Sequence, residues 1–174
     1  MKLMIASDIH GSALWCGKML DAFEAGNFDK LLLLGDILYH GPRNPLPDGH
    51  DPKVVADMLN SEKEKILCVR GNCDCEVDQM LLEFPVLADY AWLNIDGCEM
   101  FATHGHHFNN KAKEMIPPMP KGAYLLNGHF HIPEITDCGD FTYVNCGSVA
   151  LPKDGTPHSY AVFEDGIFRL EELK

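Results

Sequence analysis

Two pairs of polar residues, each with one residue between its members, follow apolar runs near opposite ends of the chain. Asp8 and His10 stand in "IASDIHG", and His129 and His131 stand in "NGHFHIP". Carboxylate and imidazole groups bind divalent metal ions, and imidazole also exchanges protons near neutral pH. If the chain is extended at these points, both members of a pair face the same way. The spacing then favours a metal site built from both pairs.

Other side chains of the same kind follow other apolar runs, usually beside glycine. They stand in "LLLLGD", "VRGN" and "FATHG". In open α/β sheets, ligands bind outside the carboxyl ends of the strands, and glycine lets the backbone turn sharply and approach a ligand. We therefore expect seven metal-competent side chains to converge on one rim of the fold: Asp8, His10, Asp36, Asn72, His104, His129 and His131.

Each of these residues alone has an ordinary explanation. A histidine after a strand is more often a surface or core residue than a ligand, and Asp or Asn beside glycine is common in turns. The joint occurrence at five strand ends is what favours a metal site. A mixed His, Asp and Asn set suits Mn²⁺, Fe²⁺, Zn²⁺ or Ni²⁺. Cys73 and Cys75 do not form a zinc knuckle, because no second cysteine pair accompanies them.

The hydrophobic pattern predicts how the elements position these residues. Strands and helices alternate in the first half, which predicts an α/β fold with a parallel sheet. The second half is rich in strands, with turns at Asp96-Gly97 and Asp165-Gly166. Residues 109–121 predict a short helix followed by an irregular link, and we expect one domain over 1–174. The predicted strands are 2–8, 30–36, 65–72, two within 91–105, 123–131, 141–149 and two within 158–173, and the predicted helices are 12–26, 52–62 and 74–84.

Composition excludes several classes of function. The net charge is −12 with only 14 Lys and Arg, which argues against a nucleic-acid binder that relies on a basic face. No apolar run approaches the roughly 20 residues that a membrane helix needs. The seven cysteines are scattered and are interpreted as free thiols of a reducing compartment. We expect a cytoplasmic protein with no membrane partner.

The order D-x-H, GD, GN, H and GHxH resembles the motif series of the calcineurin-like metallophosphoesterases. The series runs from Asp8 to His131, over most of the chain. "GDILYHGPRNPLP", "VRGNCDCEVDQMLLEFP" and "NCGSVALPKDG" further resemble a subgroup of small bacterial phosphodiesterases within that family. The resemblance implies an α/β/β/α sandwich in which two mixed β-sheets pack face to face and helices flank them.

The resemblance also implies a ligand set and an activity. One metal site resembles Asp8, His10, Asp36 and His131, and the other resembles Asp36, Asn72, His104 and His129, so that Asp36 would bridge two divalent ions. We expect Mn²⁺, with Fe²⁺, Ni²⁺ or Zn²⁺ as alternatives. A water or hydroxide between the ions would attack phosphorus. The implied activity is metal-dependent hydrolysis of phosphoric esters, as a phosphodiesterase acting on a small phosphodiester.

One motif departs from the family pattern. Many members read G-N-H-D or G-N-H-E, whereas this chain reads Gly71-Asn72-Cys73-Asp74. The missing histidine is the residue usually assigned to contact phosphate and to protonate the leaving group. A thiol would serve there only weakly, and Cys73 has an equally good interpretation as a small space-filling residue. We take Cys73, Asp74 and Arg43 as candidate catalytic residues, although Arg43 could bond loop carbonyls instead of a phosphate.

Two other functions remain open on sequence grounds. The same metals would serve a phosphomonoesterase or nucleotidase, and a non-catalytic scaffold of the same fold is known in the family. A scaffold can lose the paired histidines, whereas this chain retains every ligand of the series. The expected partner is therefore a small phosphoester and not a nucleic acid, and the sequence leaves a homo-oligomer open.

Overall fold

Strands from both ends of the chain form the first of two five-stranded sheets. The computed structural model describes residues 1–174. In the first sheet the order is β10-β9-β1-β2-β3, and in the second it is β4-β5-β6-β8-β7. The strands are β1 (Leu3–Ala6), β2 (Lys30–Leu33), β3 (Ile66–Cys68), β4 (Tyr90–Ile95), β5 (Cys98–Thr103), β6 (Ala123–Asn127), β7 (Pro133–Asp137), β8 (Phe141–Cys146), β9 (Ser159–Glu164) and β10 (Ile167–Glu172).

Both sheets are mixed, and each has a parallel centre. β1, β2 and β3 run parallel, whereas β9 pairs antiparallel with β1 and β10 with β9. In the second sheet β5, β6 and β8 are parallel, and the edge strands β4 and β7 are antiparallel. The parallel centres matter for function, because strands that run the same way deliver the loops after them to one rim.

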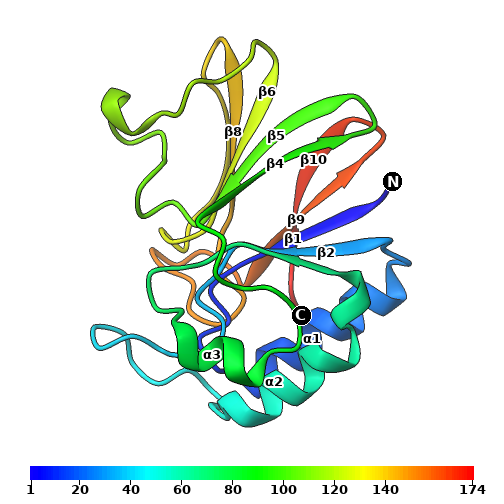
Figure 1. The fold of residues 1–174 in the computed structure, drawn as a ribbon, viewed down its shortest axis with the longest axis vertical. Helices are drawn as coiled ribbons and strands as arrows, with labels where there is room; N and C mark the ends of the chain where they lie inside the picture. Colours follow the sequence, from blue (N-terminus) through cyan, green and yellow to red (C-terminus); the bar gives the residue numbers. More distant parts are fainter.

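The two sheets pack face to face, with helices outside the first sheet (Figure 1). The alternating side chains of the leucine run show these layers. Leu31 and Leu33 belong to the core cluster that packs with the helices, whereas Leu32 and Leu34 belong to the cluster between the sheets. Burial on both faces explains the continuous apolar run. The helices are α1 (Ala13–Ala25), α2 (Pro52–Ser61) and α3 (Glu76–Leu81).

The outer face of the second sheet has a thinner cover. Phe101, Leu125, Phe141 and Tyr143 form its cluster, and Phe108, Ile116 and Met119 pack against them. The covering segment contains one 3₁₀ turn, η2 (Lys113–Met115), in place of the short α-helix predicted there. Three prolines at 117, 118 and 120 lack the N–H donors that a longer helix needs. The predicted fold class of two mixed sheets flanked by helices is confirmed.

Most other predicted elements are present, with two further differences. The structure shortens the third helix to Glu76–Leu81 and adds strand β7, which the sequence pattern did not reveal. β7 begins with Pro133 and lies at the edge of its sheet, which is where proline is tolerated because it cannot donate to the ladder. Both predicted hairpin turns are present, and Asp96, Gly97, Asp165 and Gly166 all have positive φ. None of the helices combines the length and apolarity that crossing a membrane requires.

Ser12 joins the start of α1 to the loop that carries Arg43. Its hydroxyl accepts the N–H of Trp15 at 3.2 Å and donates to the carbonyl of Asp48 at 2.6 Å. Ser12 is fully buried, so a substitution there leaves polar groups without partners.

We predict that Ser12→Ala lowers the free energy of unfolding by about 1–2 kcal/mol, because an N-cap is lost. Exposed Ser61, whose hydroxyl donates to Met58 at the end of α2, offers the matched control. Ser61→Ala should stay within about 0.5 kcal/mol of wild type. Urea denaturation measures both, and equal losses in the two variants would contradict the role given to Ser12.

Candidate metal centre

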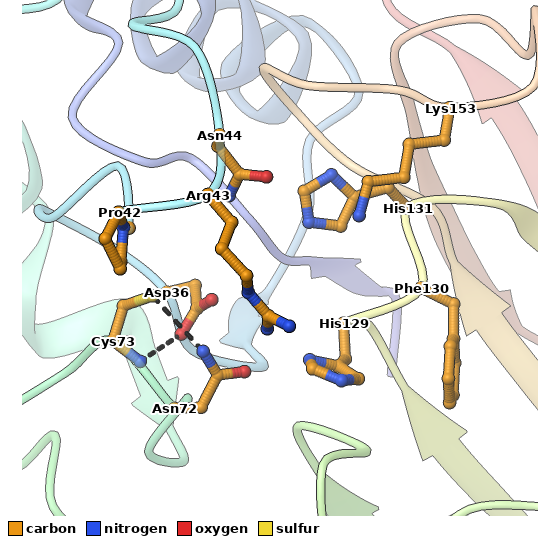
Figure 2. A pocket seen from close by; sticks show the side chains of 11 residues that line it. Asp36, Pro42, Arg43, Asn44, Asn72, Cys73, His129, Phe130, His131 and Lys153 are labelled. Carbon is orange, nitrogen blue, oxygen red and sulfur yellow. Dashed lines mark hydrogen bonds between the residues drawn. The ribbon is translucent and has the colours of Figure 1, made fainter.

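The loops after five strands bring the seven predicted ligands together at one rim. Asp8 and His10 follow β1, and Asp36 follows β2. Asn72 and His104 follow β3 and β5, and the remaining two histidines follow β6. Several of these side chains face one pocket, where Figure 2 shows Asp36, Asn72, His129 and His131 on its walls.

The first group of side chains surrounds one buried carboxylate oxygen. Oδ1 of Asp8 lies 3.4 Å from Nε2 of His10 and 3.1 Å from Nε2 of His131. The two Nε2 atoms are 3.4 Å apart. All three residues are buried, and their ligand atoms are close enough together to hold one cation.

The second group surrounds His104. Its Nε2 lies 3.1 Å from Oδ1 of Asn72 and 3.2 Å from Nδ1 of His129. His104 is fully buried. An imidazole, an amide oxygen and a second imidazole therefore meet at one point.

Asp36 lies between the two groups. Its Oδ2 is 3.8 Å from Nε2 of His10 in the first group and 3.5 Å from Nε2 of His104 in the second. Its Oδ1 accepts the backbone N–H of Cys73 at 2.8 Å. One oxygen is thus fixed by the backbone, and the other faces both groups.

The donor atoms fit metal ions, because their lone pairs face one another. Nδ1 of His10 lies 2.9 Å from the carbonyl oxygen of Tyr39, and Nδ1 of His131 faces the carbonyl of Leu151. A carbonyl only accepts, so each Nδ1 carries the proton and a neutral ring has its lone pair on Nε2. The facing Nε2 pair and the orphaned Oδ1 of Asp8, which has no hydrogen-bond partner, are the surroundings that a cation satisfies.

The pKa values of the metal-free side chains also indicate that this site favours a cation. Burial alone would lower the pKa of His104, but Asp8 and Asp36 outweigh it and raise the pKa to about 9. Burial and then the charge of His104 lower the pKa of His129 to about 4. Burial opposes ionisation of Asp8, yet the charge of His104, followed by the nearby imidazoles of His10 and His131, holds its pKa well below the usual range. The carboxylates thus favour positive charge between them.

The backbone at the paired residues is not extended, which corrects the expectation from their spacing. φ is +60° at Asp8, +50° at His10, +54° at Asp36, +63° at His129 and +62° at His131. Residues other than glycine rarely adopt this left-handed region, although Asp and His tolerate it better than most. The pairs therefore reach the site by tight left-handed turns, and such strain in a folded chain marks a functional site.

Two glycines allow the loops to approach this closely. A Cβ on Gly71 would lie 2.1 Å from Oδ1 of Asp36, and one on Gly128 would lie 2.1 Å from Oγ of Ser7 and 2.6 Å from Oδ2 of Asp8. All three contacts are shorter than carbon and oxygen permit. Any larger residue would push the ligand carboxylates out of place.

Asp74 lies behind the pocket and not in it. Its carboxylate accepts the backbone N–H groups of Asp36 at 2.8 Å, Ile37 at 2.9 Å and Gly71 at 2.7 Å. Burial, with a contribution from Asp36, raises the pKa of Asp74 to about 6 despite these bonds. The contacts of Asp74 join the loop after β2 to the loop after β3, so they position ligands.

Two cations line the pocket, which has a volume of about 380 Å³. The guanidinium of Arg43 extends between Asn72 and His129, and the Lys153 side chain extends beside His131 (Figure 2). The ion pairs of lysines and arginines all lie elsewhere, and Arg43 is not bonded to loop carbonyls. Sequence reasoning missed Lys153 and Phe130. The backbone N–H of Lys153 donates a hydrogen bond to the carbonyl of His131 at 3.1 Å, which places the lysine at the pocket. No local sequence motif predicts this position.

Comparison with known proteins identifies the family to which this fold and site belong. A model of the calcineurin-like phosphoesterase superfamily domain matches residues 1–165, and the chain belongs to this family. It is 43% identical over 173 residues to the phosphodiesterase YfcE of Escherichia coli strain K12, covering 99% of this chain and 92% of that one.

Structural comparison agrees with this assignment. The solved structure of YfcE, a phosphoesterase from E. coli, matches with a TM-score of 0.95 at 42% identity, covering 99% of this chain and 93% of that one. In sequence, the chain is also similar to a phosphodiesterase of Methanocaldococcus jannaschii, with 24% identity over 165 residues that cover 90% of this chain and 89% of that protein.

The left-handed backbone at the ligands generates a stability prediction. His129→Gly and His129→Ala remove the same imidazole, but only alanine keeps a Cβ at φ +63°. We expect the glycine variant to be more stable by about 1 kcal/mol. At Lys18, inside α1, the order should reverse by a similar amount, because glycine disfavours helix. Urea denaturation of metal-free protein measures the free energy of unfolding of the four variants. A His129→Ala variant more stable than His129→Gly would contradict backbone strain at position 129.

Proposed function

We propose that the chain is a divalent-metal-dependent phosphodiesterase that hydrolyses a small phosphodiester. The observation that carries this is the placement of Asp36, whose Oδ2 lies within 4 Å of both His10 and His104. A carboxylate shared by two groups of ligands is the arrangement expected of a two-metal phosphoesterase site. Family membership and the 43% identity to a phosphodiesterase support the reaction class.

We assign the two groups to two ions. Asp8, His10 and His131 would hold one ion together with Asp36. Asn72, His104 and His129 would hold the other, again with Asp36. Oxygen and imidazole donors of this kind suit Mn²⁺, with Fe²⁺, Ni²⁺ or Zn²⁺ as alternatives. Two such ions supply a nucleophile at neutral pH and neutralise charge on the phosphoryl group.

The protein's own side chains would bind and orient the substrate. Arg43 and Lys153 extend from two different loops that line the pocket, where they would hold phosphoryl oxygens by charge-assisted hydrogen bonds. Phe130 offers an apolar surface at the same pocket for an ester group. The pocket volume of about 380 Å³ favours a small ester. We also infer a cytoplasmic enzyme, since all seven cysteines are free.

Cys73 limits which esters react well. Burial, followed by the charge of Asp36, raises the pKa of its thiol above the usual value. The thiol therefore keeps its proton and is a poor acid for a departing alkoxide. We assign Asp74 a positioning role, because it contacts backbone amides alone. Substrates with good leaving groups should therefore be favoured.

A phosphomonoesterase on the same site is the second candidate. The two cations in the pocket favour it, because a monoester dianion carries more charge than a diester. The test is an activity screen of protein reconstituted with Mn²⁺ against bis(p-nitrophenyl) phosphate and p-nitrophenyl phosphate. We expect turnover of both, with higher kcat/KM for the diester and none in excess chelator. Turnover of neither would reject a phosphoesterase, and preference for the monoester would select the alternative.

Substitutions of Asp36 and Arg43 should differ in their effects on kcat and on bound metal. Arg43→Ala takes away an oriented phosphate donor and should cost about 10²–10³ in kcat. Asp36→Asn perturbs both proposed ions and should cost more. Steady-state kinetics together with metal analysis separates them, since only Asp36→Asn should also lower bound metal. Near wild-type turnover in Asp36→Asn would remove Asp36 from the bridging position.

Cys73→His should change the preference between the substrates. An imidazole has a pKa near ~6.5, so it donates a proton and carries charge near neutral pH. We expect the ratio of diester to monoester kcat/KM to fall or reverse. Both substrates are compared on both proteins at one pH and one Mn²⁺ concentration. An unchanged ratio would reject the role given to position 73 and leave the metal site untouched.

A further inference from the structure

Cys73 lies where it can bind a metal ion directly. Its Sγ, a ring nitrogen of His10 and a carboxylate oxygen of Asp36 all lie within 4.8 Å of one another. None of the other six cysteines joins such a group. Figure 2 shows Cys73 beside Asp36 on the wall of the pocket.

The sulfur is held close to these two partners. The Cys73 backbone N–H donates to Oδ1 of Asp36 at 2.8 Å, which ties the residue to the carboxylate. The side-chain amide of Asn72 donates to Sγ at 3.2 Å. Behind the sulfur, a Cβ on Gly41 would lie only 3.1 Å from Sγ, so little space lies on that side.

This group shares His10 and Asp36 with the proposed Mn²⁺ ligands and differs from them by the sulfur of Cys73. Sulfur, imidazole nitrogen and carboxylate oxygen together are typical ligands of Zn²⁺, and thiolates select thiophilic ions over Mn²⁺. We propose that Cys73, His10 and Asp36 form a thiolate site that captures a thiophilic divalent ion, Zn²⁺ or Cd²⁺. When the metal–sulfur bond forms, the S–H bond breaks heterolytically and its proton passes to the buffer, with no change of oxidation state.

The thiolate site overlaps the centre described above. It takes His10 and Asp36 from the ligands assigned to the two ions of the phosphodiesterase, so occupation by Zn²⁺ would exclude the productive arrangement. This consequence rests on the proposed function, whereas the metal–sulfur bond does not. A thiophilic ion bound to Cys73 would thus inhibit the phosphodiesterase and would not serve as its cofactor.

The test is a Cd²⁺ titration of the full chain after metal removal, in a buffer with a non-thiol reductant. Sulfur-to-cadmium charge transfer gives an ultraviolet absorption band that nitrogen and oxygen ligands do not give. We expect one band-forming Cd²⁺ per wild-type chain. Cys73→Ser and Cys73→Ala should each lose the band, and His10→Ala should weaken Cd²⁺ binding by at least about 10-fold.

Two exposed cysteines supply matched controls. Cys75 and Cys138 lie outside every candidate metal group, so Cys75→Ser and Cys138→Ser should keep the full band. A wild type without the band, or a band of undiminished strength in both Cys73 variants, would overturn the thiolate site. Because the readout is the metal–sulfur bond, a protein that hydrolyses no phosphoester but shows the Cys73-dependent band would support the thiolate site while rejecting the phosphodiesterase.

Discussion

The buried carboxylate of Asp36 is held at the meeting point of two groups of candidate metal ligands, and the rest of the centre depends on that placement. Its Oδ1 is fixed by the Cys73 N–H, which leaves Oδ2 facing His10 and His104. The backbone of Asp36 is fixed in turn by Asp74, which also accepts the N–H of Gly71. These bonds join the loops after β2 and β3 into one unit. Displacing either loop would separate the two groups of ligands.

The fold offsets the conformational cost of this arrangement. Five ligand residues have left-handed backbone, and at about 1–2 kcal/mol each this would total roughly 5–10 kcal/mol. A domain has a net stability of only ~5–15 kcal/mol, so the surroundings must compensate. The candidate ligands follow short strands on either side of an apolar core, where Leu32, Leu34 and Leu126 pack between the sheets. This rigid base allows strained loops to persist at the rim.

The sequence was sufficient to predict which side chains meet at the rim and to predict most elements, because both leave local signals. Polar residues after apolar runs located the rim, and Asp-Gly turns located both hairpins. Three features depended on distant parts of the chain. The paired residues looked extended from their spacing, but they form left-handed turns. Bonds to distant loops hold these turns, such as those from the N–H of His10 to the carbonyl of Asp36 and from the N–H of His129 to Oδ2 of Asp8. Strand β7 begins with proline and is a strand only because β8 pairs with it. Lys153 enters the pocket through a backbone bond to His131, which no local pattern shows.

The central claim is that Asp36 separates two ions, one on each side of it. Anomalous diffraction from crystals of the full chain grown with Mn²⁺, recorded at the manganese absorption edge, tests this most directly. The structure predicts two anomalous peaks on either side of Asp36 Oδ2. One should lie among Asp8, His10 and His131, and the other among Asn72, His104 and His129. A single peak, or two peaks that both lie away from Asp36, would contradict the account.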